Sequence, residues 1–132
     1  MKKTEVIYFN RQEGSHNYSD PSHSNVSFVT GIYNVLEDIL ICTEAQGASP
    51  ASGPAITNNK ELLKEVRLLK DGKVPDKVGV KYSNVKKANV DEDKIIKLMN
   101  DAKKLEESAQ KYNSLMESLN SGYRELVLEI NK

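Results

Sequence analysis

The sequence contains no tryptophan and only one cysteine, Cys42, among its 132 residues. A single cysteine excludes an internal disulfide and is typical of a reducing compartment, so we expect a cytoplasmic protein. Only eight residues are aromatic, which leaves the core to leucine, isoleucine and valine. No apolar run approaches the roughly 20 residues of a membrane-spanning helix. The run Val6–Phe9, preceded by Glu5, is also too short for a signal peptide, so we expect no membrane partner.

Neither sign of charge is in excess, because 19 lysines and arginines balance 19 aspartates and glutamates. Nucleic-acid-binding proteins normally show a basic excess, so we do not expect a nucleic-acid partner. The distribution is uneven: residues 1–59 carry a net −3, residues 60–89 a net +5 and residues 90–132 a net −2. The basic middle segment could face an anionic partner, although contact with the acidic flanks of the same fold is the favoured interpretation.

The length and the apolar pattern predict a single, mainly α-helical domain over residues 1–132. We expect a helical hairpin or small bundle with one long C-terminal amphipathic helix and at most a minor two-stranded β element. The expected segments, in chain order, are a short strand and polar loop (1–25), a helix (26–46), a linker (47–58), a second helix (59–71), a basic connector with a strand (72–89) and the long helix (90–131).

The first two helices are predicted from apolar residues that recur every three or four positions. In the first helix these residues are Val29, Ile32, Leu36 and Ile39, although the β-branched residues leave a strand open at the start of the segment. In the second helix they are Leu62, Leu63, Val66 and Leu69. Asn58 or Asn59 can cap the second helix, and Gly72 is a natural end for it.

Two short segments have the composition of strands. The first is Val6–Phe9, which is β-branched and aromatic throughout. In the second, Val78, Val80 and Tyr82 alternate with Gly79 and Lys81, which is typical of a half-exposed strand. We expect the two to pair if a helix covers them, because two strands alone are marginally stable.

The strongest pattern is an apolar seam that alternates steps of three and four residues over the C-terminal third of the chain. This spacing keeps one stripe of a helix facing a partner helix. No step breaks this alternation, but Gly122 is unfavourable inside a helix and could mark a bend or a close helix approach. The members of the seam are Ile95, Leu98, Ala102, Leu105, Ala109, Tyr112, Met116, Leu119, Tyr123, Leu126 and Ile130.

The seam motivates our first functional hypothesis, a non-enzymatic helical interaction protein that acts as an adaptor, a chaperone-like subunit or an assembly subunit. It would associate with itself or with another helical protein. The alternative, packing of the seam against the earlier helices of the same chain, stays open because those helices are together nearly long enough. The residues expected to bind the partner are Leu98, Leu105, Tyr112, Leu119, Tyr123 and Leu126.

A second hypothesis is a protein that binds a small ligand with a nucleotide-like anionic group. The ligand would lie between the polar loops 10–25 and 46–58, above the basic middle segment. The three arginines, Arg11, Arg67 and Arg124, could each hold a phosphate or carboxylate, although a solvated surface charge is the default for each.

Catalytic and metal signals are weak, so an enzyme is the least favoured class and no cofactor is expected. His16, Asp20 and His23 have the side-chain types of a zinc site but no regular scaffold, so no metal site is expected. Cys42 follows the apolar run Ile39–Ile41 and is expected to be a buried structural thiol.

Overall fold

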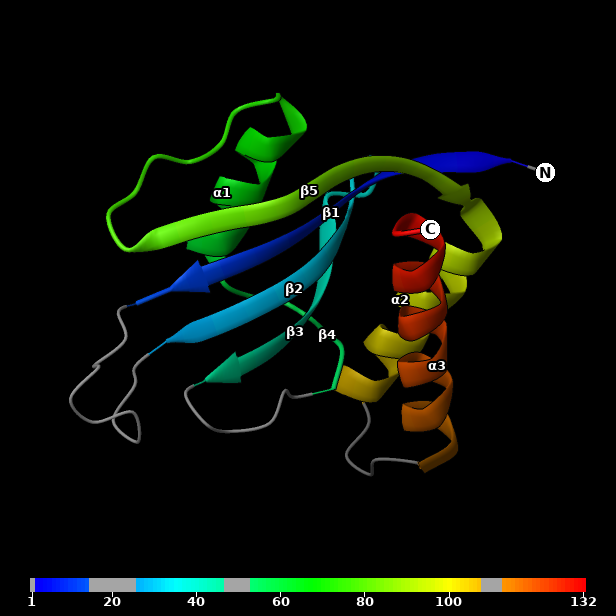
Figure 1. Cartoon of the computed structure of the whole chain (residues 1–132). Coiled ribbons are helices and arrows are strands. Elements are labelled where there is room, and N and C mark those ends of the chain that lie inside the picture. Colours follow the sequence, from blue (N-terminus) through cyan, green and yellow to red (C-terminus); the bar gives the residue numbers. More distant parts are fainter. Residues whose placement is uncertain (1, 15–25, 47–52, 108–112) are drawn as a thin grey trace.

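The fold consists of an antiparallel sheet and three helices (Figure 1). The computed structural model describes residues 2–14, 26–46, 53–107 and 113–132. In chain order the elements are β1 (Lys3–Glu13), β2 (Ser27–Asn34), β3 (Ile39–Gln46), β4 (Ala55–Ile56), α1 (Lys60–Lys70), β5 (Val80–Asp91), α2 (Glu92–Glu107) and α3 (Asn113–Ile130).

The five strands lie in the order β4-β3-β2-β1-β5, so the N-terminal and C-terminal halves of the chain meet at β1 and β5. All neighbouring strands are antiparallel. The ladder between β1 and β5 contains a bulge between Tyr8 and Asn10, where Asn84 adopts a left-handed conformation with φ of 52°.

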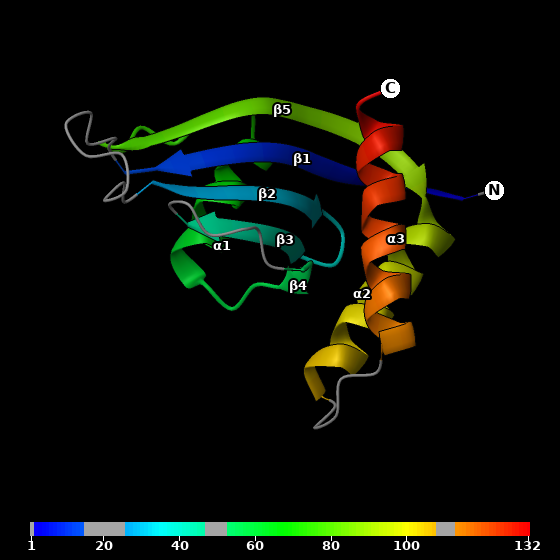
Figure 2. The ribbon, with the colours of Figure 1, turned by 60° about the horizontal axis from the view of Figure 1, so that its bottom comes forward.

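Helices cover both faces of the sheet. α1 packs on one face, here called the α1 face, and the antiparallel pair α2–α3 packs on the other, here called the hairpin face (Figures 1 and 2). The sheet extends beyond α2 and α3, which stand across one end of it (Figure 2). Phe28 of β2 lies on this uncovered part of the hairpin face, and its side chain is 44% exposed.

Each face has its own apolar core, and neighbouring residues of one strand contribute to different cores. On β1, Val6 and Tyr8 belong to the core under α2–α3, whereas Ile7 and Phe9 belong to the core under α1. All four are at most 7% exposed. A strand that is buried on both faces has a continuous apolar sequence rather than an alternating one.

The prediction of a mainly α-helical fold is wrong, since the sheet is the central layer. The segment 26–46 is a β-hairpin, β2–β3, and not a helix. Its helical spacing is accidental, because Val29 lies on the α1 face, Ile32 on the hairpin face and Leu36 in the turn. The turn has its own signals: the Asn34 side chain accepts backbone hydrogen bonds from Leu36 and Glu37.

The predicted helix over 90–131 is two helices, α2 and α3, that pack antiparallel. Leu98 of α2 lies against Gly122 of α3, and Lys94 pairs with Glu129. A three-four stripe is also what each helix of a hairpin needs to pack on a sheet, so the spacing does not distinguish one long helix from two. The connecting sequence 108–112 contains neither glycine nor proline to mark the break.

α1 occupies the segment that was predicted as helix over 59–71. The Asn59 side chain accepts a hydrogen bond from the Leu62 amide, as an N-cap does. After the helix, Gly72 has a φ of 78°, and Lys73 N–H donates to the Leu68 carbonyl. Most of the predicted connector 72–89 belongs to β5, which pairs with β1 within a five-stranded sheet and not as a minor element. The expected pairing of 78–82 with Val6–Phe9 is wrong in register, because residues 80–83 lie opposite 10–13, whereas Val6, Ile7 and Tyr8 lie opposite residues 86–88.

Candidate functional site

The seam residues lie mostly inside the protein. Leu98, Leu119, Tyr123 and Leu126 are at most 7% exposed and pack against the hairpin face. Leu105 is partly buried at the edge of the same core. Tyr112 lies outside the described residues. The buried seam residues that the structure describes therefore pack within their own chain, which is the alternative that the sequence left open, although they are covered by a sheet and not by a helix.

Tyr123 anchors α3 to the sheet. Its hydroxyl donates a hydrogen bond of 2.8 Å to the Thr30 carbonyl of β2. Burial raises the pKa of Tyr123, so the hydroxyl stays protonated and remains a donor.

Arg11, the first of the three ligand candidates, is buried in an ion pair with Glu65 of α1. The Arg11 Nε–Glu65 Oε1 distance is 2.9 Å, and both side chains are at most 8% exposed. Arg11 Nη2 donates a second hydrogen bond to the same carboxylate, and the Tyr82 hydroxyl of β5 donates a third. Burial alone would raise the pKa of Glu65, but the hydrogen bonds from Arg11 and Tyr82 hold it below its ordinary value. Arg11 is therefore occupied within the fold.

Arg67, the second candidate, is also occupied. It forms two hydrogen bonds to Asp38, of 3.0 and 2.7 Å, and so joins α1 to the turn between β2 and β3. Tyr33 donates a further hydrogen bond to Asp38. Hydrogen bonds from Arg67 and Tyr33 lower the pKa of Asp38 to about 2. This pair joins the basic middle segment to the acidic N-terminal flank.

Arg124 differs from the other two arginines, because it forms no ion pair with any described residue. Its neighbours one helical turn away on α3 are Asn120, Ser121, Val127 and Leu128, none of which is charged. The side chain instead lines a surface cavity of about 500 Å³ between α3 and the sheet. Thr30, Thr43, Gly53, Pro54, Asn120, Tyr123, Val127 and Leu128 complete the lining.

This cavity continues along α3 into a second one of about 300 Å³, and the two share Gly53, Pro54 and Asn120. The second cavity is more apolar, with Leu105 and the 36% exposed side chain of Met116 in its lining. We call the joined cavities the α3 groove. The groove has one cation, Arg124, and no carboxylate among its lining residues. It is the strongest candidate for a binding site.

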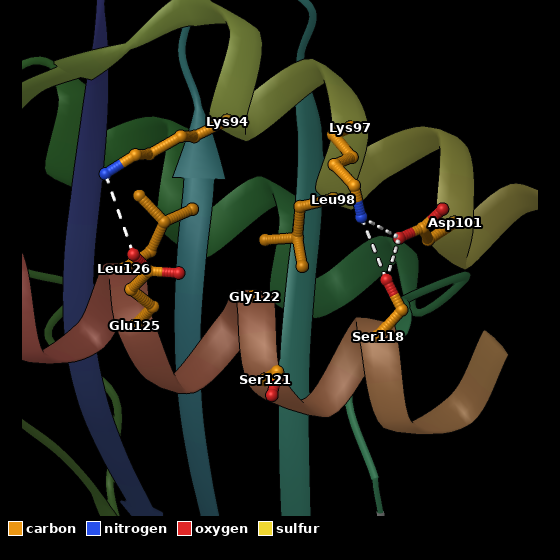
Figure 3. Close-up of a pocket in the computed structure, with 9 residues that line it drawn as sticks. All are labelled: Lys94, Lys97, Leu98, Asp101, Ser118, Ser121, Gly122, Glu125 and Leu126. Atoms are coloured by element: carbon orange, nitrogen blue, oxygen red, sulfur yellow. Dashed lines mark hydrogen bonds and ion pairs between the residues drawn. The ribbon is translucent and has the colours of Figure 1, made fainter. Parts of the chain in front are cut away.

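A third cavity, of about 210 Å³, lies between α2 and α3 (Figure 3). Lys97, Asp101 and Ser118 converge there: Lys97 Nζ lies 2.8 Å from Ser118 Oγ and 3.1 Å from Asp101 Oδ2. The grouping resembles a lysine-activated serine, but such a lysine must be neutral to accept the serine proton. The Lys97 side chain is 67% exposed and forms an ion pair with Asp101. We interpret the cluster as a tie between the two helices.

The metal candidates His16, Asp20 and His23 lie outside the described residues. Within the described ranges, no group of three histidine, cysteine, aspartate or glutamate side chains is placed to hold a metal ion. Cys42 lies on β3 in the core under α1, as expected for a structural thiol. Burial raises its pKa to about 12, which makes it a poor nucleophile.

The site as a whole was not predicted. Arg124 and Leu105 were predicted as binding residues in different hypotheses, whereas Asn120 and Pro54 were not predicted. One signal was readable: on a helix, Arg124 has no carboxylate one turn away in either direction. The contribution of β2, β3 and residues 53–54 required the sheet topology.

No protein-family model matches the chain, and comparisons with the curated proteins and with the solved structures also find no match. Among the described residues, no helix combines the length and the apolar character needed to cross a membrane.

Proposed function

We propose that this chain is a non-enzymatic binding protein that holds an anionic group of its ligand at Arg124 in the α3 groove. The observation that carries the proposal is a lone arginine in a cavity lined by no carboxylate. An arginine can bind a carboxylate or phosphate through two parallel hydrogen bonds. As in the second hypothesis from the sequence, the ligand carries an anionic group, but its binding site is on α3 and not on the basic middle segment.

The same groove supports an adaptor or assembly role better than the seam does. Leu98, Leu119 and Leu126 are committed to the core of the chain, so a partner cannot reach them without unfolding α2–α3. Met116 and Leu105 belong to the seam and also line the groove. We therefore propose that any partner protein binds at the groove. We place this activity in the cytoplasm, which suits a chain whose single cysteine can form no internal disulfide.

Amide-detected NMR titration tests the proposal with three probes: N-acetylglutamate, inorganic phosphate and, as a neutral control, N-acetylglutamine. We expect N-acetylglutamate or phosphate to shift the signals of α3 and of Gly53, and the neutral probe to leave them unchanged. Arg124→Gln should abolish the shifts. Lys64→Gln is the matched control, because it removes one exposed positive charge from α1 on the opposite face. Equal shifts in the Arg124→Gln protein would refute the proposal.

A further inference from the structure

We propose that the ligand of the α3 groove is an extended peptide segment of a partner protein, with an acidic side chain and a bulky apolar side chain about four residues apart. The inference rests on the proposed function, because the acidic side chain is the anionic group that Arg124 holds. It adds the class of ligand and the spacing of the two side chains.

The two ends of the groove differ in chemistry. At one end Arg124 is a cation without a carboxylate partner among the described residues. At the other end Leu105, Met116 and Leu119 form an apolar lining. A complementary ligand therefore has an anionic group at the Arg124 end and a hydrophobic side chain at the apolar end.

The middle of the groove favours a peptide over a hydrocarbon chain. Asn120 lies one helical turn from Arg124 and one turn from Met116, and it lines both cavities. Its side-chain amide has no hydrogen-bond partner among the described residues. An amide can donate to a carbonyl and accept from an N–H at once, which matches a peptide backbone. A hydrocarbon chain has neither group to offer.

The spacing follows from the geometry of α3. Arg124 and Met116 are eight residues apart, which is about 12 Å along a helix that rises 1.5 Å per residue. An extended peptide advances about 3.3 Å per residue, so about four residues cover the same distance. When a glutamate or aspartate of the peptide binds Arg124, the peptide residue three or four positions along therefore lies beside Met116.

Fluorescence polarisation with labelled hexapeptides tests the inference. One set has glutamate at a fixed position and leucine two, three, four or five positions after it, with the other positions drawn from alanine, serine and threonine. A second set has leucine before glutamate, because the direction of the peptide along α3 is open. A third replaces glutamate by glutamine, and dodecanoate is tested separately as a competitor of the best peptide.

We expect the tightest binding at a spacing of three or four, in one of the two directions. Arg124→Gln should weaken it roughly tenfold, the size of one charge-assisted contact, and the glutamine peptides should bind as weakly. Met116→Ser should weaken the leucine-containing peptides several-fold, whereas Leu68→Ser, a change at a similarly exposed leucine of α1, should not. Circular dichroism of each variant checks that the fold is intact.

The outcomes separate this inference from the proposed function. Binding that depends on Arg124 and glutamate but not on the spacing or on Met116 would overturn the peptide assignment and leave anion binding standing. Dodecanoate that binds more tightly than every peptide would also overturn it, in favour of an acyl ligand. Binding that is unchanged in Arg124→Gln, or no binding by any peptide or by the probes of the NMR titration, would overturn both.

Discussion

The two faces of the sheet are covered in different ways. On the α1 face, one helix of 11 residues covers the strands, and a charged pair, Arg11 with Glu65, is buried beside it. On the hairpin face, two helices of 16 and 18 residues lie over the strands, and no described charged side chain is buried. Charges on the α1 face are thus used to complete the fold. The charged side chains of α2–α3 lie at the surface, and one of them, Arg124, forms no ion pair with any described residue.

The largest expected effect comes from a charge placed under the hairpin. Leu126 is 1% exposed, so Leu126→Asp would bury a carboxylate without a partner, and we expect a loss of about 4 kcal/mol or more in the free energy of unfolding. Leu128→Asp is the matched control, because Leu128 lies on the same helix and is 66% exposed; it should cost less than about 0.5 kcal/mol. Urea unfolding followed by circular dichroism measures both.

The same pair of variants distinguishes a core from an intermolecular seam. If α3 were a zipper between chains, Leu126→Asp would yield helical monomers. The structure predicts loss of folded protein at any concentration. A folded, helical Leu126→Asp monomer would contradict the burial of the seam against the sheet.

A smaller loss is expected when the buried ion pair of the α1 face is broken. Glu65→Leu removes the carboxylate and leaves Arg11, which is 7% exposed, with only the half-exposed Glu13, so we expect a loss of about 3 kcal/mol. Arg11→Met combined with Glu65→Leu removes both charges and should recover most of that loss. Thermal unfolding of the two variants gives the comparison. A double variant as unstable as the single one would mean that packing, and not an unpaired charge, sets the cost.

The two faces of the sheet also differ in how much of their structure could be predicted from the sequence. α1 was predicted within one residue of its ends, because an isolated surface helix keeps its apolar stripe, its Asn59 cap and its Gly72 stop in the local sequence. β2 and β3 were predicted as a helix, because β2 mixes side chains of both cores and therefore shows no period of two. Val6–Phe9 in β1 and Val78–Tyr82 at the start of β5 were predicted as strands, but not as parts of a five-stranded sheet. The α3 groove could not be predicted, since Thr43, Pro54 and Arg124 meet only through sheet order and helix packing.

Acidic pH should weaken the α1 side of the protein before the hairpin. Among the described carboxylates, Asp38 and Glu65 have a lowered pKa, and both hold α1 in place. A lowered pKa means that the stabilisation is complete above the unfolded value, 3.8 for Asp38, and is lost as the pH falls toward about 2. The Arg67–Asp38 pair is half-exposed, so solvent screens it and its contribution to stability is small.

Asp38→Asn tests the contribution of the Asp38 charge to stability without disturbing the turn. Asp38 has a φ of 57°, and asparagine tolerates this left-handed conformation as well as aspartate does. The variant should be less stable than the parent at pH 6, and the difference should shrink as the pH falls from 4 to 2.5. Hydrogen exchange at pH 2.5 should show α1 opening before α2–α3. A difference that stays constant with pH would mean that the Asp38 charge does not stabilise the fold.

The smallest expected effect is a gain in stability, from a substitution in the α2–α3 pair. Gly122 is an interior residue of α3, where glycine costs about 1 kcal/mol relative to alanine. A Cβ at this position would lie 3.4 Å from Leu98 Cδ1 and near no other described atom within 4 Å, which is an ordinary contact at its lower limit. We therefore expect Gly122→Ala to raise the free energy of unfolding by about 0.5 kcal/mol.

Gly31→Ala is the contrasting variant of the α1 face, because its Cβ would lie 2.7 Å from Phe9 Cζ inside a full core, and it should destabilise the protein. Thermal unfolding of both decides the point. A loss of stability in Gly122→Ala would mean that the hairpin needs a closer helix approach than alanine allows, and that its core is packed as tightly as that of the α1 face.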